Sequence, residues 1–356
     1  MFSGERRYTV KTSRSSSKIT REQLNDQLSF RRYRDLKSHL KEKYGETVYR
    51  IPIDAGFGCP HRDAQLGFGG CIYCDSTGSG FSVDKSLSIT QQIEKRIREL
   101  EDRGIRKFIA YFQAGSNTYG SLEKLEKIYR SALVDGVVAL DVSTRPDLVP
   151  DEVLALLDSF SGEVDVILEL GLQSVNNGTL RRINRKHSLA DFIDAVVRAR
   201  KYKLELVAHV ITNLPWDSIE DVIECARILS SLGVDGVKMH SLYVVKDSPL
   251  GQSGDLEFLS SMTLDDFTFR TVEFLDNLDP GIVIHRLVSD PPREGVVFGN
   301  WGLPKIVILN EIQKRLVSES RYQGRKCSLG TCLTGKRDEW SRRFEESPDS
   351  SGKDAG

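Results

Sequence analysis

The feature that most constrains the fold of this chain is a regular alternation of short apolar runs with longer amphipathic segments. The runs are rich in β-branched and aromatic residues, and several are apolar on both faces, as parallel strands covered by helices are. Six of them lie at residues 48–53, 107–112, 136–142, 164–170, 204–211 and 236–243. The segments between them, such as residues 90–100, have helical periodicity. The alternation predicts a parallel α/β fold.

Two architectures agree with this order of elements: an open doubly wound sheet, and a full or partial barrel of the TIM type. No G-x-G-x-x-G motif follows the first run, so a dinucleotide-binding domain lacks its main signature. In a barrel the chemistry lies on the loops after the carboxyl ends of the strands. The unusual residues of this sequence fall in those loops.

Charge separates the ends of the chain from its body. The net charge of −1 for 356 residues conceals 13 Lys and Arg against 6 Asp and Glu in residues 1–50. We predict a flexible basic arm at residues 1–27 and favour a solvated tail there. A contact for an acidic partner such as RNA, or an organellar transit peptide, are the alternatives. Residues 327–356 are predicted to be a disordered tail.

Composition also limits the cellular setting. No apolar run approaches the roughly 18 residues that span a membrane, so we expect no membrane partner. Six Cys are too sparse for a disulfide scaffold, and a cytoplasmic location is therefore expected. In that compartment, clustered thiols more often bind metal or perform redox chemistry.

Three Cys cluster in the Gly-rich loop after the first run, as Cys59, Cys71 and Cys74 with the spacing C-x11-C-x2-C. Three interpretations compete. A structural zinc site would use His61 as its fourth ligand, and a redox pair at Cys71 and Cys74 would leave Cys59 without a role. A [4Fe–4S] cluster on three thiolates would keep one iron open for an exogenous ligand. On the spacing of the Cys alone, a zinc site is almost as well supported as an iron–sulfur cluster.

The sequence resembles the radical S-adenosylmethionine (SAM) enzymes, and more narrowly the YhcC/YtqA-type group, which is related to the radical SAM subunit of elongator. The resemblance covers roughly residues 28–326 and is strongest in DAGFGCPHRD and GGCIYC. The usual spacing in the superfamily is C-x3-C-x2-C, and the expanded first gap marks this group. Further matching stretches lie at residues 111–119, 143–150, 168–174, 183–188, 237–250 and 321–326.

The resemblance implies a partial (β/α)6 barrel of the radical SAM type at residues 28–250, with a C-terminal α/β extension at residues 251–326. It implies that Cys59, Cys71 and Cys74 ligate a [4Fe–4S] cluster whose open iron is chelated by SAM. Reductive cleavage of SAM would then give a 5′-deoxyadenosyl radical that abstracts a substrate hydrogen. The chain would be an enzyme of the transferase or oxidoreductase class, reduced by an electron donor such as flavodoxin or ferredoxin.

The family pattern also implies contacts with SAM. An aromatic residue lies near the adenine, a small-residue turn faces the methionine amino group, and polar groups face the ribose or the carboxylate. Arg185 would bind the carboxylate in a bidentate fork, and Glu169 is functional only if it points into the barrel. The positions that match are Tyr73, Gln113, Ala114, Gly115, Thr144, Arg145, Glu169, Gln173 and Arg185.

Some positions depart from the family pattern or stand apart from it. Asn213 and Trp216 occupy a turn that is Gly-Leu-Pro-Gly in many relatives, and His61 replaces a usual Asn. Three histidines near strand ends face either the pocket or the core, and two further residues are candidates for the substrate side. Cys225 is predicted to be a packing residue, and two more Cys to be exposed thiols. These positions are His187, His209 and His240, then Tyr243 and Lys246, then Cys327 and Cys332.

The substrate is the least determined part. Kinship with elongator suggests modification of a tRNA wobble uridine, although no aromatic-rich RNA-binding module is visible in the sequence. A small-molecule substrate is the alternative within the radical SAM class. A zinc-stabilised binding protein without catalysis is the alternative outside it.

Overall fold

The computed structural model describes residues 31–62, 69–74, 83, 86–254 and 256–329. The chain divides into two compact units, Met1–Arg31 and Arg32–Gly356. The sheet, its helices and the candidate site all belong to the second unit. The predicted basic arm and most of the predicted C-terminal tail lie outside the described residues.

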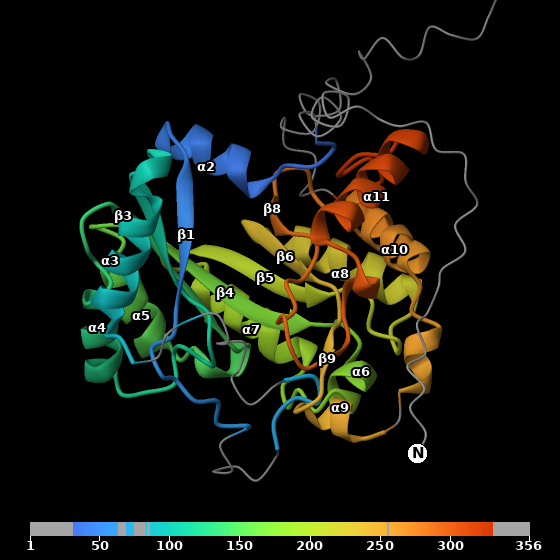
Figure 1. Ribbon diagram of the computed structural model, residues 1–356, viewed down its shortest axis with the longest axis horizontal. Helices are drawn as coiled ribbons and strands as arrows, with labels where there is room; N and C mark the ends of the chain where they lie inside the picture. The colour runs from blue at the N-terminus through green and yellow to red at the C-terminus, as the bar shows by residue number, and fades with distance from the viewer. Residues whose placement is uncertain (1–30, 63–68, 75–82, 84–85, 255, 330–356) are drawn as a thin grey trace, which may run out of the picture. The chain divides into compact units, whose positions relative to one another are not determined.

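A seven-stranded parallel sheet forms the centre of this unit (Figure 1). Its hydrogen-bonded order, β1-β2-β3-β4-β5-β6-β8, follows the order of the chain, whereas a doubly wound sheet reverses its order at a switch point. The partial α/β barrel is thereby confirmed, and all six predicted strands are present. The strands are Val48–Ile53 (β1), Lys107–Phe112 (β2), Val137–Thr144 (β3), Asp165–Gln173 (β4), Glu205–Ile211 (β5), Gly236–His240 (β6) and Val283–Arg286 (β8).

The seventh strand comes from the segment expected to form a C-terminal extension. β8 pairs in parallel with β6, so the sheet continues past residue 250. The boundary between barrel and extension stays a prediction. A separate two-stranded antiparallel sheet consists of Val244–Val245 (β7) and Val296–Phe298 (β9).

Helices follow the strands, as the periodicity predicts, and they cover the outer face of the sheet (Figure 1). Capping boxes open α3, α7 and α8, where Ser88, Ser188 and Ser218 each accept a bond from the third residue of the helix. The α-helices are Leu36–Tyr44 (α2), Ile89–Leu100 (α3), Leu122–Arg130 (α4), Asp151–Ser159 (α5), Asn177–Arg182 (α6), Leu189–Ala199 (α7), Ile219–Leu232 (α8), Pro249–Gln252 (α9), Leu264–Asn277 (α10) and Lys305–Ser318 (α11). Short 3-10 turns lie at Glu101–Arg103, Pro146–Leu148, Glu257–Ser260 and Asn300–Gly302.

The main core fills the space between the sheet and its helices. Phe112, Tyr129 and Phe160 are almost fully buried and stack edge to face, with ring centroids 5.4 and 6.0 Å apart. The Tyr129 hydroxyl donates to the carbonyl of Asn117 at 2.6 Å, which satisfies its one buried polar atom. Each such ring stabilises the fold by about 1.5–3 kcal/mol through burial.

The segment after β8 is tied back to the sheet by buried polar contacts. Arg321 Nε donates to Asp276 of α10 at 2.6 Å, and Gln323 Nε2 donates to the carbonyls of Asp279 and Ile282. Cys225 is buried on α8, as predicted. Cys327 is only 2% exposed and is disulfide-bonded, so the prediction of an exposed thiol there is wrong. Cys332 lies outside the described residues.

Within the described part of the chain, the search for a helix both long and apolar enough to cross a bilayer finds none.

Candidate functional site

The carboxyl ends of all seven parallel strands surround one cavity of about 180 Å³. Ten of the twelve predicted site residues line it. Ala114 is buried behind the wall, and Glu169 lies below it. The ten are Cys59, Cys71, Tyr73, Cys74, Gln113, Gly115, Thr144, Arg145, Gln173 and Arg185.

Gly115 allows the loop after β2 to rest against the loop that carries the Cys. Its φ is +75°, and a Cβ at this position would lie 2.3 Å from the carbonyl oxygen of Phe57. The amide of Ser116 donates to the carbonyl of Gly58 at 3.0 Å. Gly115 therefore fixes the backbone directly before Cys59, a role separate from the SAM contact predicted for it.

The segment between α6 and α7 is hydrogen-bonded to the loop around Cys71. The Ile72 amide donates to the Ile183 carbonyl at 3.1 Å, and Asn184 Nδ2 donates to the carbonyl of Gly70 at 2.6 Å. Asn184 adopts a left-handed φ of 56°, which Asn tolerates better than most residues. These bonds bring two stretches more than a hundred residues apart into one site.

Arg185 links this segment to the thiol of Cys71. Its Nη1 lies 3.6 Å from Cys71 Sγ, its Nη2 donates to the Gly171 carbonyl at 2.7 Å, and its Nε donates to His187 Nε2 at 2.8 Å. The guanidinium thus places a positive charge beside the sulfur that is predicted to bind the cluster. Since all three nitrogens have partners, a SAM carboxylate bound in the predicted fork would have to replace one of them.

His187 serves this arrangement as a neutral acceptor. Because Arg185 can only donate, His187 Nε2 accepts, and its Nδ1 lies 3.2 Å from the carbonyl of Ser188. Burial, together with the charges of Arg185 and Arg145, lowers the pKa of His187 to about 3. His187 therefore positions Arg185 and does not line the cavity.

Arg145 offers an unused donor on the cavity wall. It binds Asp147 through Nε and Nη2 at 2.9 and 3.0 Å, and Nη2 also donates to the carbonyl of Arg185 at 2.7 Å. Its buried Nη1 has no hydrogen-bond partner among the described residues. A ligand oxygen in the cavity would satisfy this donor, which fits the ribose or carboxylate contact predicted for Arg145.

The three Cys all line the cavity. Cys71 is buried, while Cys59 and Cys74 are half-buried on the cavity wall. Tetrahedral zinc needs four donors on one ion, whereas each Cys of a cubane binds a different iron. His61 Nε2, the expected fourth zinc ligand, lies 3.1 Å from Asp147 Oδ2.

Glu169 points into the barrel but lies beneath the cavity, where it is fully buried. It accepts from Lys238 Nζ at 2.9 Å and from Arg50 Nη1 at 3.3 Å, and its Oε2 lies 2.7 Å from His209 Nε2. Burial alone would raise the pKa of Glu169, but Lys238, His209 and Arg50 hold that pKa well below its usual range. The contacts support a role for Glu169 in holding the barrel interior together.

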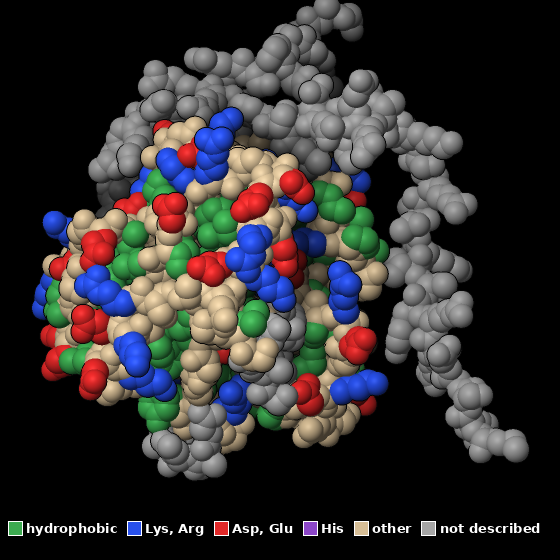
Figure 2. All heavy atoms as spheres, turned by 60° about the vertical axis from the view of Figure 1, so that its left-hand side comes forward, with side chains coloured by type: hydrophobic (Ala, Val, Ile, Leu, Met, Phe, Trp, Pro, Cys, Tyr) green, Lys and Arg blue, Asp and Glu red, His purple; other side chains and the backbone are tan. Residues whose placement is uncertain are grey.

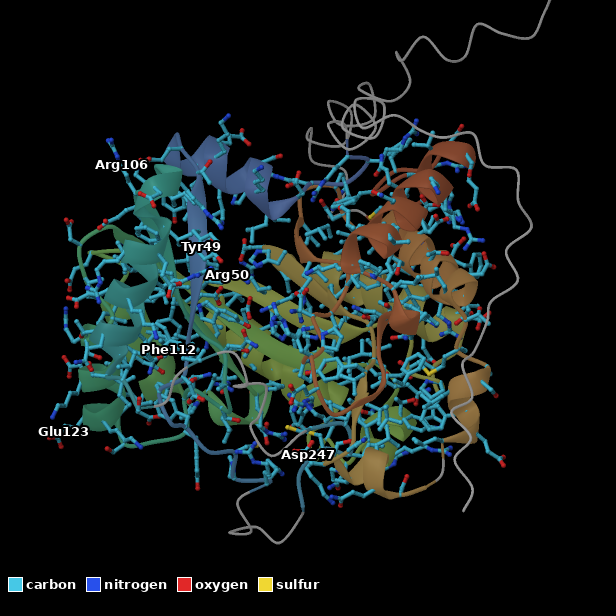
Figure 3. The ribbon with its side chains drawn as sticks, in the orientation of Figure 1. Tyr49, Arg50, Arg106, Phe112, Glu123 and Asp247 are labelled. Atoms are coloured by element: carbon cyan, nitrogen blue, oxygen red, sulfur yellow. The ribbon has the colours of Figure 1, made fainter. Side chains whose placement is uncertain are left out.

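The contacts of Glu169 belong to a polar layer that crosses the barrel and that sequence reasoning missed. Burial lowers the pKa of Lys238 to about 7 and raises that of Asp141 to about 8. Arg50, labelled on β1 in Figure 3, reaches His285 Nδ1 at 3.0 Å and so connects the two edge strands. The available signal was a polar residue inside each otherwise apolar run. The layer comprises Arg50, Tyr111, Asp141, Glu169, His209, Lys238 and His285.

The remaining candidates divide between the cavity and the surface. His209, His240 and Tyr243 line the cavity, whereas Lys246 is exposed and lies away from it. The departures from the family pattern also lie off the cavity wall. Asn213 accepts from the amide of Leu242 at 2.8 Å, and Trp216 packs on Phe258 with centroids 5.5 Å apart.

Comparisons with known proteins place the chain in a family. The family model described as "Radical SAM superfamily" matches residues 55–244, and "Radical_SAM C-terminal domain" matches residues 234–318. YtqA of Bacillus subtilis strain 168 is 34% identical over 303 residues, which are 83% of this chain and 92% of YtqA. A tRNA uridine(34) acetyltransferase of Dehalococcoides mccartyi strain CBDB1 is 26% identical over 212 residues, 58% of this chain and 44% of that protein.

A solved structure shares the fold. Elp3 of the archaeon Methanocaldococcus infernus, lacking residues 1–46, superposes with a TM-score of 0.57 at 18% identity. The match covers 78% of this chain and 64% of that one, so this chain spans slightly less than two thirds of the Elp3 structure. The superfamily match spans more than half of the chain, and YtqA matches most of it. The chain therefore belongs to the radical SAM superfamily, whose enzymes use a [4Fe–4S] cluster and SAM.

Proposed function

We propose that this radical SAM enzyme modifies a C–H position of a wobble uridine, or of its side chain, in tRNA. The observation that carries the chemistry is the convergence of three Cys and seven further predicted site residues on one cavity. Support for the substrate comes from similarity to a protein named tRNA uridine(34) acetyltransferase and from the fold shared with Elp3. Similarity to known proteins thus supports the proposed substrate, whereas the residues around the cavity support the proposed chemistry.

The protein's own residues have distinct tasks in this proposal. Cys59, Cys71 and Cys74 would hold the cluster, with the positive charge of Arg185 beside Cys71. Arg145 Nη1 would donate to an oxygen of SAM, and Tyr73 would lie beside the adenine. When bound, the cluster and SAM supply an electron and a 5′-deoxyadenosyl radical that abstracts a hydrogen atom from the substrate.

Contacts with partners extend beyond the cavity. On the face shown in Figure 2, Lys and Arg side chains are interspersed with Asp and Glu, so this face offers no broad basic surface to RNA. The predicted basic arm at residues 1–27 is the candidate contact for RNA, and a donor such as flavodoxin or ferredoxin would reduce the cluster. The cytoplasm supplies both tRNA and such donors.

The radical SAM chemistry has a direct test. Anaerobically reconstituted protein should absorb broadly near ~400 nm, as thiolate-bound clusters do. It should release methionine and 5′-deoxyadenosine when a reductant and SAM are added. Cys71→Ala should abolish absorbance and cleavage, while Cys225→Ala, at a buried Cys on α8, should retain both. A colourless protein that holds one zinc ion would contradict the assignment.

The tRNA substrate has a separate test. Nucleosides from the tRNA of a strain lacking the protein should differ from wild type in one wobble-uridine derivative. Wild-type protein should restore that derivative, whereas Cys71→Ala should not. An unchanged nucleoside profile would overturn the tRNA assignment and leave the small-molecule alternative.

A further inference from the structure

The cavity wall is strongly cationic. Four arginines line it, together with two histidines, and no Asp or Glu appears among the described lining residues. Arg145 and Arg185 belong to the network beside the Cys, and Arg62 lies in the Cys loop itself. Arg286 comes from a different part of the wall, at the last position of β8. Its place there needs a separate explanation.

A bulge in β8 gives Arg286 its direction. Val237 of β6 pairs with Ile284 and Lys238 pairs with Arg286, so His285 is an extra residue on the β8 side. Successive side chains of a regular strand point to opposite faces, but a bulge re-aims one of them. His285 thus reaches Arg50 and Glu169 in the barrel interior, and its neighbour Arg286 still lines the cavity.

The charge of Arg286 is poorly compensated. Its Nη2 lies within hydrogen-bonding reach of both ring nitrogens of His240, Nδ1 at 2.7 Å and Nε2, and its buried Nε has no hydrogen-bond partner among the described residues. Its nearest carboxylate, Asp290, is 3.7 Å from Nη1, is 60% exposed and binds Lys305 at 2.6 Å. The Arg286 side chain as a whole is 18% exposed, and its Nε is buried. A largely buried arginine with an unused donor calls for an anionic partner.

His240 does not supply that partner charge. Because Arg286 only donates, the ring nitrogen of His240 that receives its hydrogen is an unprotonated acceptor. Burial, then the nearby charges of Arg286, His209 and Lys238, lower the pKa of His240 well below its usual range. The histidine therefore orients the guanidinium while remaining neutral.

We propose that Arg286, oriented by His240, binds an anionic group of the substrate, a carboxylate or a phosphate, at the β6 and β8 side of the cavity. The inference rests on the proposed radical SAM function, since it assigns this part of the cavity to substrate. It does not depend on the substrate being tRNA. The rival occupant is the carboxylate of SAM itself, and the test must separate the two.

The test measures anion binding to the reconstituted, oxidised holoenzyme with SAM present, so that no turnover occurs. Acetate and inorganic phosphate are titrated calorimetrically at constant ionic strength. One of them should bind wild type, and which one binds identifies the group. Arg286→Gln should weaken that binding about tenfold or more, the effect of losing a charge-assisted hydrogen bond. Arg286→Lys keeps the charge but loses the forked donor geometry of the guanidinium. Its affinity for the anion should lie between those of wild type and Arg286→Gln.

A matched control and a second ligand decide the outcome. Arg62→Gln removes one positive charge from the same wall and should leave anion binding within about twofold of wild type. The Kd for SAM should be unchanged in Arg286→Gln, and its absorbance near ~400 nm shows that it has folded and holds the cluster. The proposal is overturned if neither anion binds wild type, if both Gln variants behave alike, or if SAM binding falls with anion binding.

Failure of this inference is distinguishable from failure of the proposed function. Anion binding requires neither reduction nor tRNA, so it persists if the nucleoside profile proves unchanged. Conversely, failure of the radical SAM chemistry is seen in the absorbance and SAM cleavage of the wild-type protein, which are measured without any Arg286 variant.

Discussion

At the scale of single residues, glycines set how closely the loops around the cavity approach one another. Gly115 faces the carbonyl of Phe57, and a Cβ on Gly171 would lie 2.5 Å from Arg185 Nη2. Both positions make room for groups that are themselves part of the site. A side chain there would displace the Cys loop or the Arg185 guanidinium without removing any chemical group.

We expect Gly115→Ala to lower the amount of cluster bound per chain more than Gly104→Ala does, although both substitutions strain the backbone to a similar degree. Gly104 is the matched control, because its φ of +66° is similar and a Cβ added there would meet nothing within 4 Å. Both substitutions should cost about 1–2 kcal/mol for left-handed backbone. Only Gly115→Ala should also reduce the iron bound per chain after reconstitution, since it pushes on the backbone before Cys59. Equal iron content in the two variants would contradict this role.

The positions predicted from sequence are the three Cys, which stand out by their spacing, and nine more that the family resemblance implies. Ten of these twelve line the cavity. Arg286 escaped prediction because a regular strand cannot direct both it and His285 inward. The bulge that permits this depends on the register with β6.

At the scale of elements, the C-terminal segment completes the sheet and is then fastened to it. β8 adds the seventh strand, and α10 packs against both α8 and α11. Arg321 joins the chain after α11 to α10 through Asp276 and Glu273. Asp276 is fully buried, so its charge depends on this contact.

We expect Arg321→Gln to reduce the free energy of unfolding by about 3–5 kcal/mol, because it leaves a buried carboxylate without its main partner. Lys314→Gln removes a surface ion pair of α11, in which Nζ lies 2.7 Å from Glu311 and the Lys314 side chain is 53% exposed, and should cost about 0–1 kcal/mol. Urea denaturation of both variants measures the difference. If the two variants unfold at the same urea concentration, Arg321 does not hold the segment.

At the scale of the whole molecule, charged side chains occupy part of the barrel interior. Arg50 of the edge strand β1 and Lys238 of the inner strand β6 both bind Glu169 of the central strand β4, and histidines on β5 and β8 complete the layer. A buried ionic layer is costly to desolvate and therefore demands near-complete pairing. It fixes the relative register of strands far apart in sequence.

Four buried histidines make the molecule sensitive to acid. Burial lowers the pKa of His209 and of His285 to about 4 and that of His187 to about 3, and the pKa of His240 is also well below its usual range. In the unfolded chain each takes up a proton near pH 6.5. Between about pH 6.5 and 4 the unfolded state thus binds more protons, so stability is present above pH 6.5 and is lost as pH falls.

We expect the urea midpoint to fall steadily below pH 6.5, with each histidine contributing up to about 1.4 kcal/mol per pH unit. His285→Gln should reduce the proton uptake on unfolding between pH 6.5 and 4.5 by about one. A variant with the same pH slope as wild type would show that His285 does not stay neutral in the fold.

The sequence by itself determined the strand and helix alternation, the Cys-bearing loop and the family, because each depends on neighbouring residues or on a motif of fixed spacing. The tertiary structure alone decided which of these residues meet. Curling of the sheet brings seven strand ends around one cavity, and the segment around Asn184 and Arg185 reaches the Cys loop. The inward charge layer and Arg286 depend on register and on a bulge. Register is a relation between strands, and periodicity within one strand does not contain it.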